Sequence, residues 1–209
     1  FDTLTGDGGA TWLFRIAHNT CLDILKSARM RRQQPMPEGW EELNLPHSWN
    51  AIDGQDGGND YFRGTCRYTK TIAKSELPEG VRCYLEINGA NSSATVFVNG
   101  KEVAQHDGGY STWRVDITDE LSEETKIEID VDNAANERVY PQMADFTFYG
   151  GLYRDVNLIC VSESHFALEY YGTPGIKVTP IVDGDNANVE VEIWTKNAEG
   201  KALTYIITD

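Results

Sequence analysis

The sequence predicts an all-β protein. Its main part is expected to be an antiparallel jelly-roll β-sandwich, with an N-terminal helical extension before it and the start of an immunoglobulin-like β-sandwich after it. Apolar and polar residues alternate at 81–88 and 125–132, the period-two pattern of strands with one buried face. Asn99-Gly100 separates two short apolar segments, and this pair favours the type I′ turn of a tight hairpin.

Residues 1–34 are predicted to form the helical extension. Between 12 and 32, apolar residues recur at spacings of three and four, Thr11 can cap the start, and basic residues gather at the end, where the helix dipole favours cations. This segment has more basic than acidic residues, whereas the rest of the chain is strongly acidic. The changes in charge and periodicity at Pro35 mark a separate segment.

Residues 35–172 are predicted to form the jelly-roll. Besides the alternating segments, strands are expected at about 66–73, 112–118 and 153–161 and on both sides of the Asn-Gly pair. Gly, Asn and Asp residues separate these strands. Short strands joined by such turns over roughly 140 residues are typical of an antiparallel sandwich.

Residues 173–209 are predicted to begin a second domain. Two strands are expected, at 176–180 and 188–194, the second with alternating apolar residues. An immunoglobulin-like sandwich needs roughly 100 residues. We therefore expect this sequence to stop inside that domain.

Composition narrows the classes of function. The chain has 33 acidic residues against 18 Lys and Arg, a formal net charge of −15, which opposes binding to nucleic acid and to anionic membranes. No apolar segment approaches the roughly 20 residues that cross a bilayer, and no signal peptide is recognised. The four cysteines form neither zinc-ligand pairs nor a disulfide framework. Buried free thiols and a cytoplasmic location are expected, with a periplasmic or secreted location left open.

Six short motifs follow one another along the chain. They are Leu45-Pro-His-Ser-Trp-Asn50, Tyr61-Phe-Arg-Gly-Thr-Cys-Arg-Tyr68, Val96-Phe-Val-Asn-Gly-Lys-Glu-Val103, His106-Asp-Gly-Gly-Tyr110, Val131-Asp-Asn133 and Asp145-Phe-Thr-Phe-Tyr-Gly-Gly-Leu-Tyr-Arg-Asp-Val-Asn-Leu158. Together they resemble the N-terminal sugar-binding domain of glycoside hydrolase family 2, the β-galactosidase and β-glucuronidase family. The resemblance implies a galactose-binding-like jelly-roll, followed by an immunoglobulin-like domain and a (β/α)₈ barrel with two catalytic glutamates.

A second resemblance concerns the N-terminal segment alone. Residues 12–26, with the basic residues 29–32, are similar to region 2 of an extracytoplasmic-function sigma factor. In that family this region contributes to recognition of promoter DNA. A fusion or an artefact explains such an isolated segment more simply than a working sigma factor.

The first resemblance also implies substrate-binding residues. Asp145 occupies the position whose carboxylate reaches the sugar in glucuronidase-like members. Asp155 matches the acid that lies near the substrate and a bound sodium ion in galactosidase-like members. Tyr149, Asn59 and Asp60 are further candidates, because sugar hydroxyls need polar partners and sugar rings stack on aromatic planes. Sodium or magnesium in the full-length enzyme is the only cofactor that the resemblance suggests.

Structural alternatives exist for these candidates. For Asp145 the alternative role is to cap a turn, and for Asp155 it is to pair with Arg154 or Arg63. Asn59 and Asp60 have the alternative of lying in a solvated loop. The aromatic residues near them, such as Trp49 and Phe62, either stack on a sugar or pack in the core. The sequence leaves both possibilities open.

The expected function is that of a non-catalytic sugar-binding domain, which rims the active-site cleft of a retaining β-glycosidase. Retaining hydrolysis needs two carboxyl groups about 5–5.5 Å apart, and the resemblance places both in the barrel, so no catalytic residue is expected here. The alternatives are a stand-alone carbohydrate-binding module and, more weakly, a DNA-binding protein. The expected partners are a β-glycoside substrate, the downstream barrel of the same polypeptide and further copies in a homo-oligomer.

Overall fold

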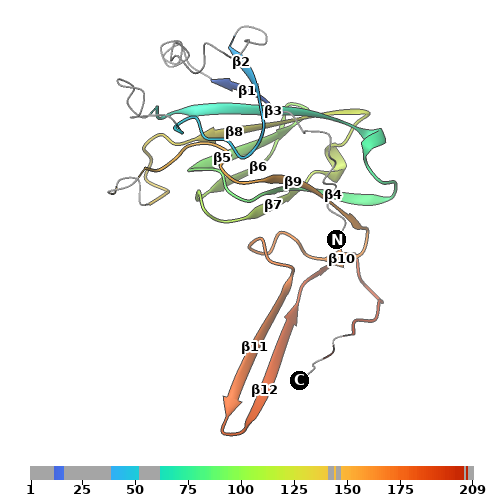
Figure 1. Cartoon of the computed structure of the whole chain (residues 1–209). Coiled ribbons are helices and arrows are strands. Elements are labelled where there is room, and N and C mark those ends of the chain that lie inside the picture. The colour runs from blue at the N-terminus through green and yellow to red at the C-terminus, as the bar shows by residue number, and fades with distance from the viewer. Residues whose placement is uncertain are drawn as a thin grey trace.

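The computed structural model describes residues 12–16, 39–51, 62–140, 144, 147–204 and 206. They form two main antiparallel sheets that pack face to face (Figure 1), so the predicted all-β sandwich is confirmed. The larger sheet has the strand order β2-β1-β3-β8-β5-β6, and the smaller has the order β7-β4-β9. In chain order the strands are β1 Trp12–Ile16, β2 Trp40–Leu43, β3 Thr65–Ala73, β4 Val81–Ile87, β5 Ser93–Val98, β6 Lys101–Asp107, β7 Trp113–Asp116, β8 Glu124–Asp132 and β9 Val156–Ser162.

The predicted alternation builds the core between the sheets. On β8, Ile127, Ile129 and Val131 are fully buried, and on β4 Leu85 and Ile87 face them from the smaller sheet. Burying each such side chain contributes about 1.5–3 kcal/mol. The core therefore holds together the strands whose far ends carry the loops described below.

The β5–β6 hairpin has the predicted turn. Asn99 and Gly100 have φ angles of 51° and 82°, the positive values that a type I′ turn needs at both central residues. Asn99 also ties the turn to β8, because Lys126 N donates to its Oδ1 at 2.9 Å.

The predicted helix at 12–32 is wrong at its start. Residues 12–16 form β1, which pairs antiparallel with β2 on one side and β3 on the other. Trp, Phe and Ile favour strands, and five consecutive, mostly apolar residues do not reveal their periodicity, so tertiary pairing decides. The remaining residues of the expected helix lie outside the described ranges, and the boundary at residue 34 stays a prediction.

Helical structure in the described ranges is limited to two 3₁₀ turns, η4 Lys74–Glu76 and η5 Thr118–Glu120. No helix within those ranges is long and apolar enough to cross a bilayer.

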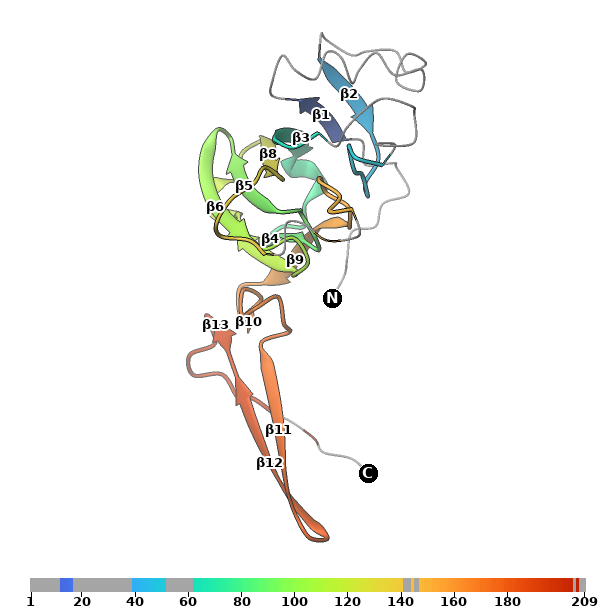
Figure 2. The same cartoon turned by 90° about the vertical axis from the view of Figure 1, so that its left-hand side faces the viewer.

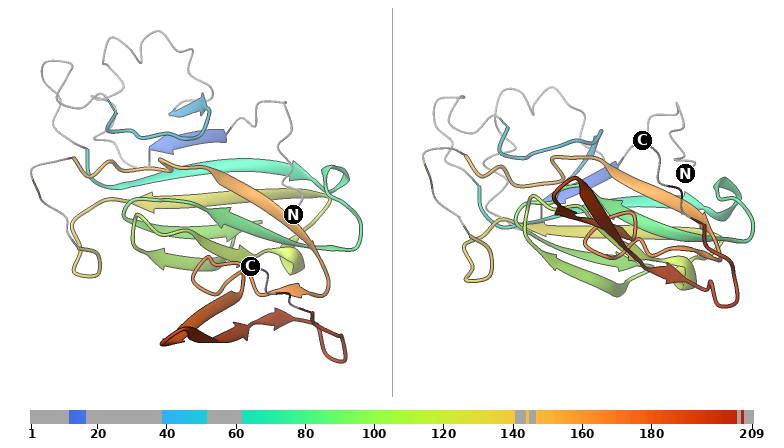
Figure 3. Two further views of the ribbon diagram at one scale, coloured as in Figure 1. Left: turned by 60° about the horizontal axis from the view of Figure 1, so that its bottom comes forward. Right: turned by 90° about the horizontal axis from the view of Figure 1, so that it is seen from below.

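Beyond the sandwich, the chain forms a long hairpin that projects away from it (Figure 2). β11 Ile176–Asp183 pairs with β12 Asn186–Ile193, and the short strands β10 His165–Phe166 and β13 Thr195–Lys196 pair at its base. Both strands predicted for this region are therefore present. One hairpin face is apolar, with Val178 opposite Val191, and Val178 is 58% exposed. Figure 3 shows the hairpin outside both layers of the sandwich.

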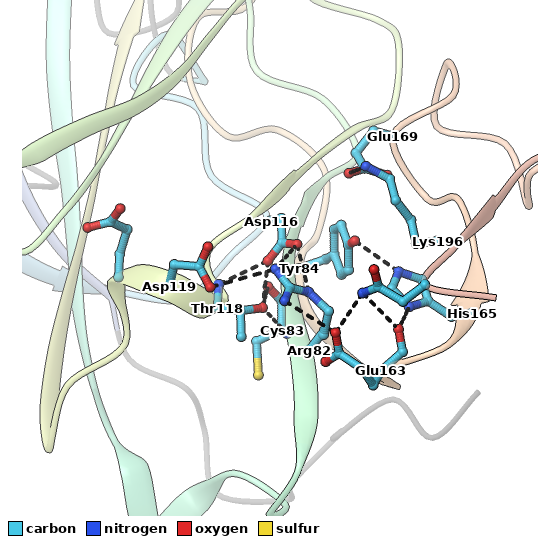
Figure 4. A network of polar contacts seen from close by, with 12 residues as sticks. Arg82, Cys83, Tyr84, Asp116, Thr118, Asp119, Glu163, His165, Glu169 and Lys196 are labelled. Atoms are coloured by element: carbon cyan, nitrogen blue, oxygen red, sulfur yellow. Dashed lines mark hydrogen bonds and ion pairs between the residues drawn. The ribbon is translucent and has the colours of Figure 1, made fainter. Parts of the chain in front are cut away.

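A polar network joins the sandwich to the base of the hairpin (Figure 4). Tyr84 of β4 and His165 of β10 lie with OH and Nε2 2.9 Å apart. Beside them, Arg82 Nη2 lies 2.8 Å from Asp116 Oδ2. Tyr84 is fully buried, so the outer face of the smaller sheet is covered at this point.

Candidate functional site

Several loops meet at one end of the sandwich. The register pairs Thr65, at the start of β3, with Asp132, at the end of β8, and pairs Asp132 with Ser93, at the start of β5. In the smaller sheet, Ile87 at the end of β4 pairs with Val156 at the start of β9. The loops before and after these strands therefore share one edge of the fold, and the segment 147–152, from the last sequence motif, runs among them.

Asn50 lies at the centre of this edge and is 1% exposed. Its Oδ1 accepts hydrogen bonds from Gly150 N at 2.8 Å and from Asn133 Nδ2 at 3.1 Å. Its Nδ2 donates to Phe62 O at 3.0 Å. One buried amide thus fixes three loops that are far apart in the sequence.

Asn133 and Asn91 extend this arrangement. Asn133 Oδ1 accepts from Gly64 N at 2.9 Å, and Asn91 Nδ2 donates to Tyr149 O at 2.9 Å. The backbone of Asn91 also forms an antiparallel bridge with Gly151. We call Asn50, Asn91 and Asn133, each at most 5% exposed, the asparagine triad.

The Gly150-Gly151 pair permits this close approach. A Cβ atom on Gly150 would lie 2.5 Å from Asn133 Nδ2, and one on Gly151 would lie 2.6 Å from His47 O. Gly151 also has φ +121°, where other residues are strained. The two glycines are needed because the backbone itself packs against the triad and against His47.

His47 and Tyr68 hold the far side of the same segment. His47 N donates to Leu152 O at 2.8 Å, Leu152 N donates to Tyr68 OH at 3.3 Å, and His47 Nδ1 lies 2.9 Å from that hydroxyl. Burial lowers the pKa of His47 to about 4 and raises the pKa of Tyr68 well above its ordinary value. Both side chains are therefore neutral near pH 7 and serve as hydrogen-bonding supports.

Two of the predicted site residues are placed by the structure. Tyr149 is 44% exposed, while its carbonyl is held by the triad, so its ring is available at the surface. Asp155 is exposed and directly precedes β9 at the same end, and its carbonyl accepts from Asn88 N at 3.1 Å. Asp145, Asn59 and Asp60 lie outside the described residues.

For Asp155, the structure shows what the neighbouring Arg154 contacts. Arg154 Nη1 donates to Tyr110 O at 2.9 Å and to Asn88 O at 3.4 Å. Asp155 itself lies at an exposed position of this edge.

Asp155 alone does not make a cation site. No group of three or more His, Cys, Asp or Glu residues suited to a metal occurs among the described residues. Carbonyl oxygens or water would therefore have to complete a sodium or magnesium site at Asp155.

Trp49 packs in the core and does not form a sugar-stacking wall. Its side chain is 8% exposed, it meets the ring of Phe62 edge to face at 6.5 Å, and its Nε1 donates to Phe62 O at 3.3 Å. Among the aromatic candidates that the structure describes at this edge, Tyr149 has the ring that is exposed.

The fold and the edge described above define a jelly-roll β-sandwich domain with its candidate site on loops at one end. Residues 60–152 match the family model described as the glycosyl hydrolase 2 galactose-binding domain-like family. Residues 60–152 thus belong to the domain family that the sequence motifs predicted.

Relatives and solved structures agree with this assignment. A beta-glucuronidase of Bacteroides fragilis is 35% identical over 173 residues, which cover 80% of this chain and 25% of that protein. A beta-galactosidase of Thermoanaerobacter pseudethanolicus is 26% identical over 183 residues, covering 81% of this chain and 25% of that protein. The crystal structure of an FMN-binding beta-glucuronidase from Facaelibacterium prausnitzii is similar with a TM-score of 0.73 and 39% identity, covering 94% of this chain and 28% of that chain.

The chain thus spans about a quarter of the length of these proteins. These matches lend no support to the sigma-factor resemblance of the N-terminal segment.

The asparagine triad was not predicted from the sequence. Asn50 and Asn133 each end a recognised motif, and Asn91 precedes β5, so each had a local signal as a loop residue. Only the fold shows that their side chains converge on the segment 147–152.

Proposed function

We propose that this chain is the non-catalytic sugar-binding domain of a family 2 β-glycosidase of β-glucuronidase type, and that it rims the active-site cleft. The observation that carries the proposal is the segment 147–152, which hydrogen bonds from the asparagine triad hold at a loop edge with the Tyr149 ring exposed. The matches at 35% and 39% identity, both to proteins named beta-glucuronidase, favour that type over β-galactosidase.

In this proposal the residues of the chain bind and orient the glycoside. Asp145 and Asp155 accept hydrogen bonds from sugar hydroxyls, Tyr149 packs against the sugar or aglycone, and Asn59 and Asp60 supply further polar contacts. The two glutamates that cleave the bond belong to the downstream barrel. Binding of sodium or magnesium and homo-oligomer formation by the full-length enzyme are proposals of the same kind.

The hairpin supports the proposed continuation of the polypeptide. Its apolar face, which includes Val178 and Val189, is exposed to solvent, and an isolated two-stranded hairpin is at best marginally stable in water. We propose that further strands of an immunoglobulin-like domain cover this face, with the barrel following that domain.

The test compares the full-length protein with the 209-residue chain. The full-length protein is expected to hydrolyse nitrophenyl β-glucuronide, and the chain alone is expected to show no turnover, because it lacks the paired glutamates. Turnover by the repurified chain would contradict the proposal. Calorimetric titration of the chain with glucuronides and galactosides separates the alternative, since micromolar to millimolar binding without the barrel would indicate a stand-alone carbohydrate-binding module.

In the full-length enzyme, Asp145→Ala is expected to lower kcat/KM by roughly 10- to 150-fold, because a hydrogen bond to a charged acceptor contributes about 1.5–3 kcal/mol. Asp155→Ala is also expected to lower kcat/KM, although water competes for the hydrogen bonds of its exposed carboxylate. Melting temperatures are measured for the same variants, so that a loss of activity caused by unfolding is recognised. Asp185→Ala, in the distant turn of the hairpin, is the control and should change neither. An unchanged kcat/KM for Asp145→Ala would contradict substrate binding by this residue and favour a turn-capping role.

A further inference from the structure

Two cysteines of the smaller sheet face each other. Cys83 of β4 and Cys160 of β9 are direct partners in the antiparallel register, and their Sγ atoms lie 3.7 Å apart. Cys83 is 1% exposed, whereas Cys160 is partly exposed. Both side chains point between the two sheets, where Cys83 belongs to the core and Cys160 packs against it.

This arrangement satisfies the geometry of a disulfide with little movement. Directly opposed residues in antiparallel strands have Cα atoms about 4.5–5.5 Å apart, within the range of about 4.4–6.8 Å that disulfides join. The sulfurs must approach to about 2.05 Å, which requires rotation about the Cα–Cβ bonds. The backbone at Cys83 can stay in place, held by the hydrogen bonds from Cys83 N to Thr118 Oγ1 and from Ile117 N to Cys83 O, both 2.9 Å.

The two thiols are suited to different steps. Burial, together with the adjacent Cys160, raises the pKa of the Cys83 thiol to about 12, so Cys83 stays protonated and reacts poorly with reagents in solution. Cys160 is the more accessible thiol, so an oxidant reaches it first. Cys83 is then positioned to attack from the opposite strand.

We propose that Cys83 and Cys160 form an oxidative modification site, at which a low-molecular-weight disulfide converts the pair into an intramolecular disulfide. The Cys160 thiolate attacks the reagent, forms a mixed disulfide and releases one thiol. Cys83 then loses its proton and attacks Cys160 Sγ, which forms the protein disulfide and releases the second thiol. The protein loses two electrons and two protons, and the reagent is reduced to two thiols. This site is independent of the proposed sugar chemistry.

The bond would fasten β9 to the middle strand of the smaller sheet. β9 leads through a turn directly into β10 and the network of Tyr84 and His165. A disulfide between these strands closes a long loop of the unfolded chain, which stabilises the folded state. For a protein of this size the melting temperature is expected to rise by roughly 4–16 °C.

The test treats the reduced 209-residue chain with oxidised glutathione. The oxidised protein is expected to lose two titratable thiols of its four cysteines in denaturant and to retain no glutathione. Its digest should yield a peptide that joins Cys83 to Cys160, and its melting temperature should rise and return to the original value with dithiothreitol. Comparing oxidised with reduced wild-type protein requires no substitution that could prevent folding.

Matched variants assign the bond. Cys66→Ala, which removes a buried cysteine from β3 in the other sheet, should leave the crosslink intact, whereas Cys160→Ala should abolish both the crosslink and the shift in melting temperature. Glutathione retained on Cys160, four thiols still titratable, or a crosslink that uses Cys21 or Cys66 would each overturn the proposal.

Discussion

Gly151→Ala is expected to destabilise the sandwich by roughly 2–5 kcal/mol. A side chain at φ +121° is strained, which costs about 1–2 kcal/mol. The added Cβ would also meet His47 O at 2.6 Å and the Tyr68 hydroxyl oxygen at 2.7 Å, and such overpacking costs about 1–3 kcal/mol. The Tyr68 hydroxyl accepts a hydrogen bond from Leu152 N, and the backbone of His47 is fixed by the hydrogen bond from its N to Leu152 O. Neither group can therefore move aside cheaply. Urea unfolding followed by tryptophan fluorescence measures the loss.

Gly100→Ala is the matched control for Gly151. Gly100 also has a positive φ, +82°, but a Cβ there would meet nothing within 4 Å. Its cost is expected to be the backbone strain alone, about 1–2 kcal/mol. The difference between the two variants measures the close approach at the loop edge. Equal losses would mean that the segment 147–152 is loosely packed.

Asn50→Ala is expected to cost about 2–4 kcal/mol. The substitution leaves the buried Gly150 N–H without its acceptor and weakens the hydrogen bonding of Asn133 Nδ2 and Phe62 O. Each buried polar group left without a partner costs about 1–3 kcal/mol. Phe62 O keeps the hydrogen bonds from Trp49 and Asn133, which limits the total loss of stability. Denaturant unfolding gives the change in free energy, and hydrogen exchange should show faster exchange at the Gly150 amide.

Asn157→Ala provides the comparison for Asn50. The Asn157 side chain is half-buried and donates one hydrogen bond, to Glu86 Oε1 at 3.0 Å. Its removal is expected to cost about 1 kcal/mol and to leave exchange at Gly150 unchanged. A loss for Asn50→Ala no larger than that for Asn157→Ala would contradict the central role given to Asn50.

The sequence predicted those parts of the fold whose signals are local. The alternation along β4 and β8 reflects burial of one strand face, and the Asn99-Gly100 turn depends on the φ angles of two residues. β1 was missed because its five residues are suited to a strand or a helix, and pairing with β2 and β3, far along the chain, determines which forms.

The candidate site was predictable only in part, for the same reason. Tyr149 was a candidate because it belongs to a sequence motif. The side chains that hold this motif in place were not predictable from the sequence. Asn50 lies 100 positions before Gly150, and no local pattern indicates that the side chain of one meets the backbone of the other. The buried position of Trp49 also depends on this meeting, because Gly150 leaves space for its ring.

The hydrogen bonds of Asn50 have a consequence for the order of folding. They join residues 12, 83 and 100 positions apart, and closing long loops costs chain entropy before such contacts can form. The β5–β6 hairpin needs only neighbouring residues and can form early, whereas the asparagine triad can assemble only after both sheets have formed. The loop edge that carries Tyr149 is therefore the late-folding part of the domain, and its amides are expected to open by local unfolding while the core strands stay closed.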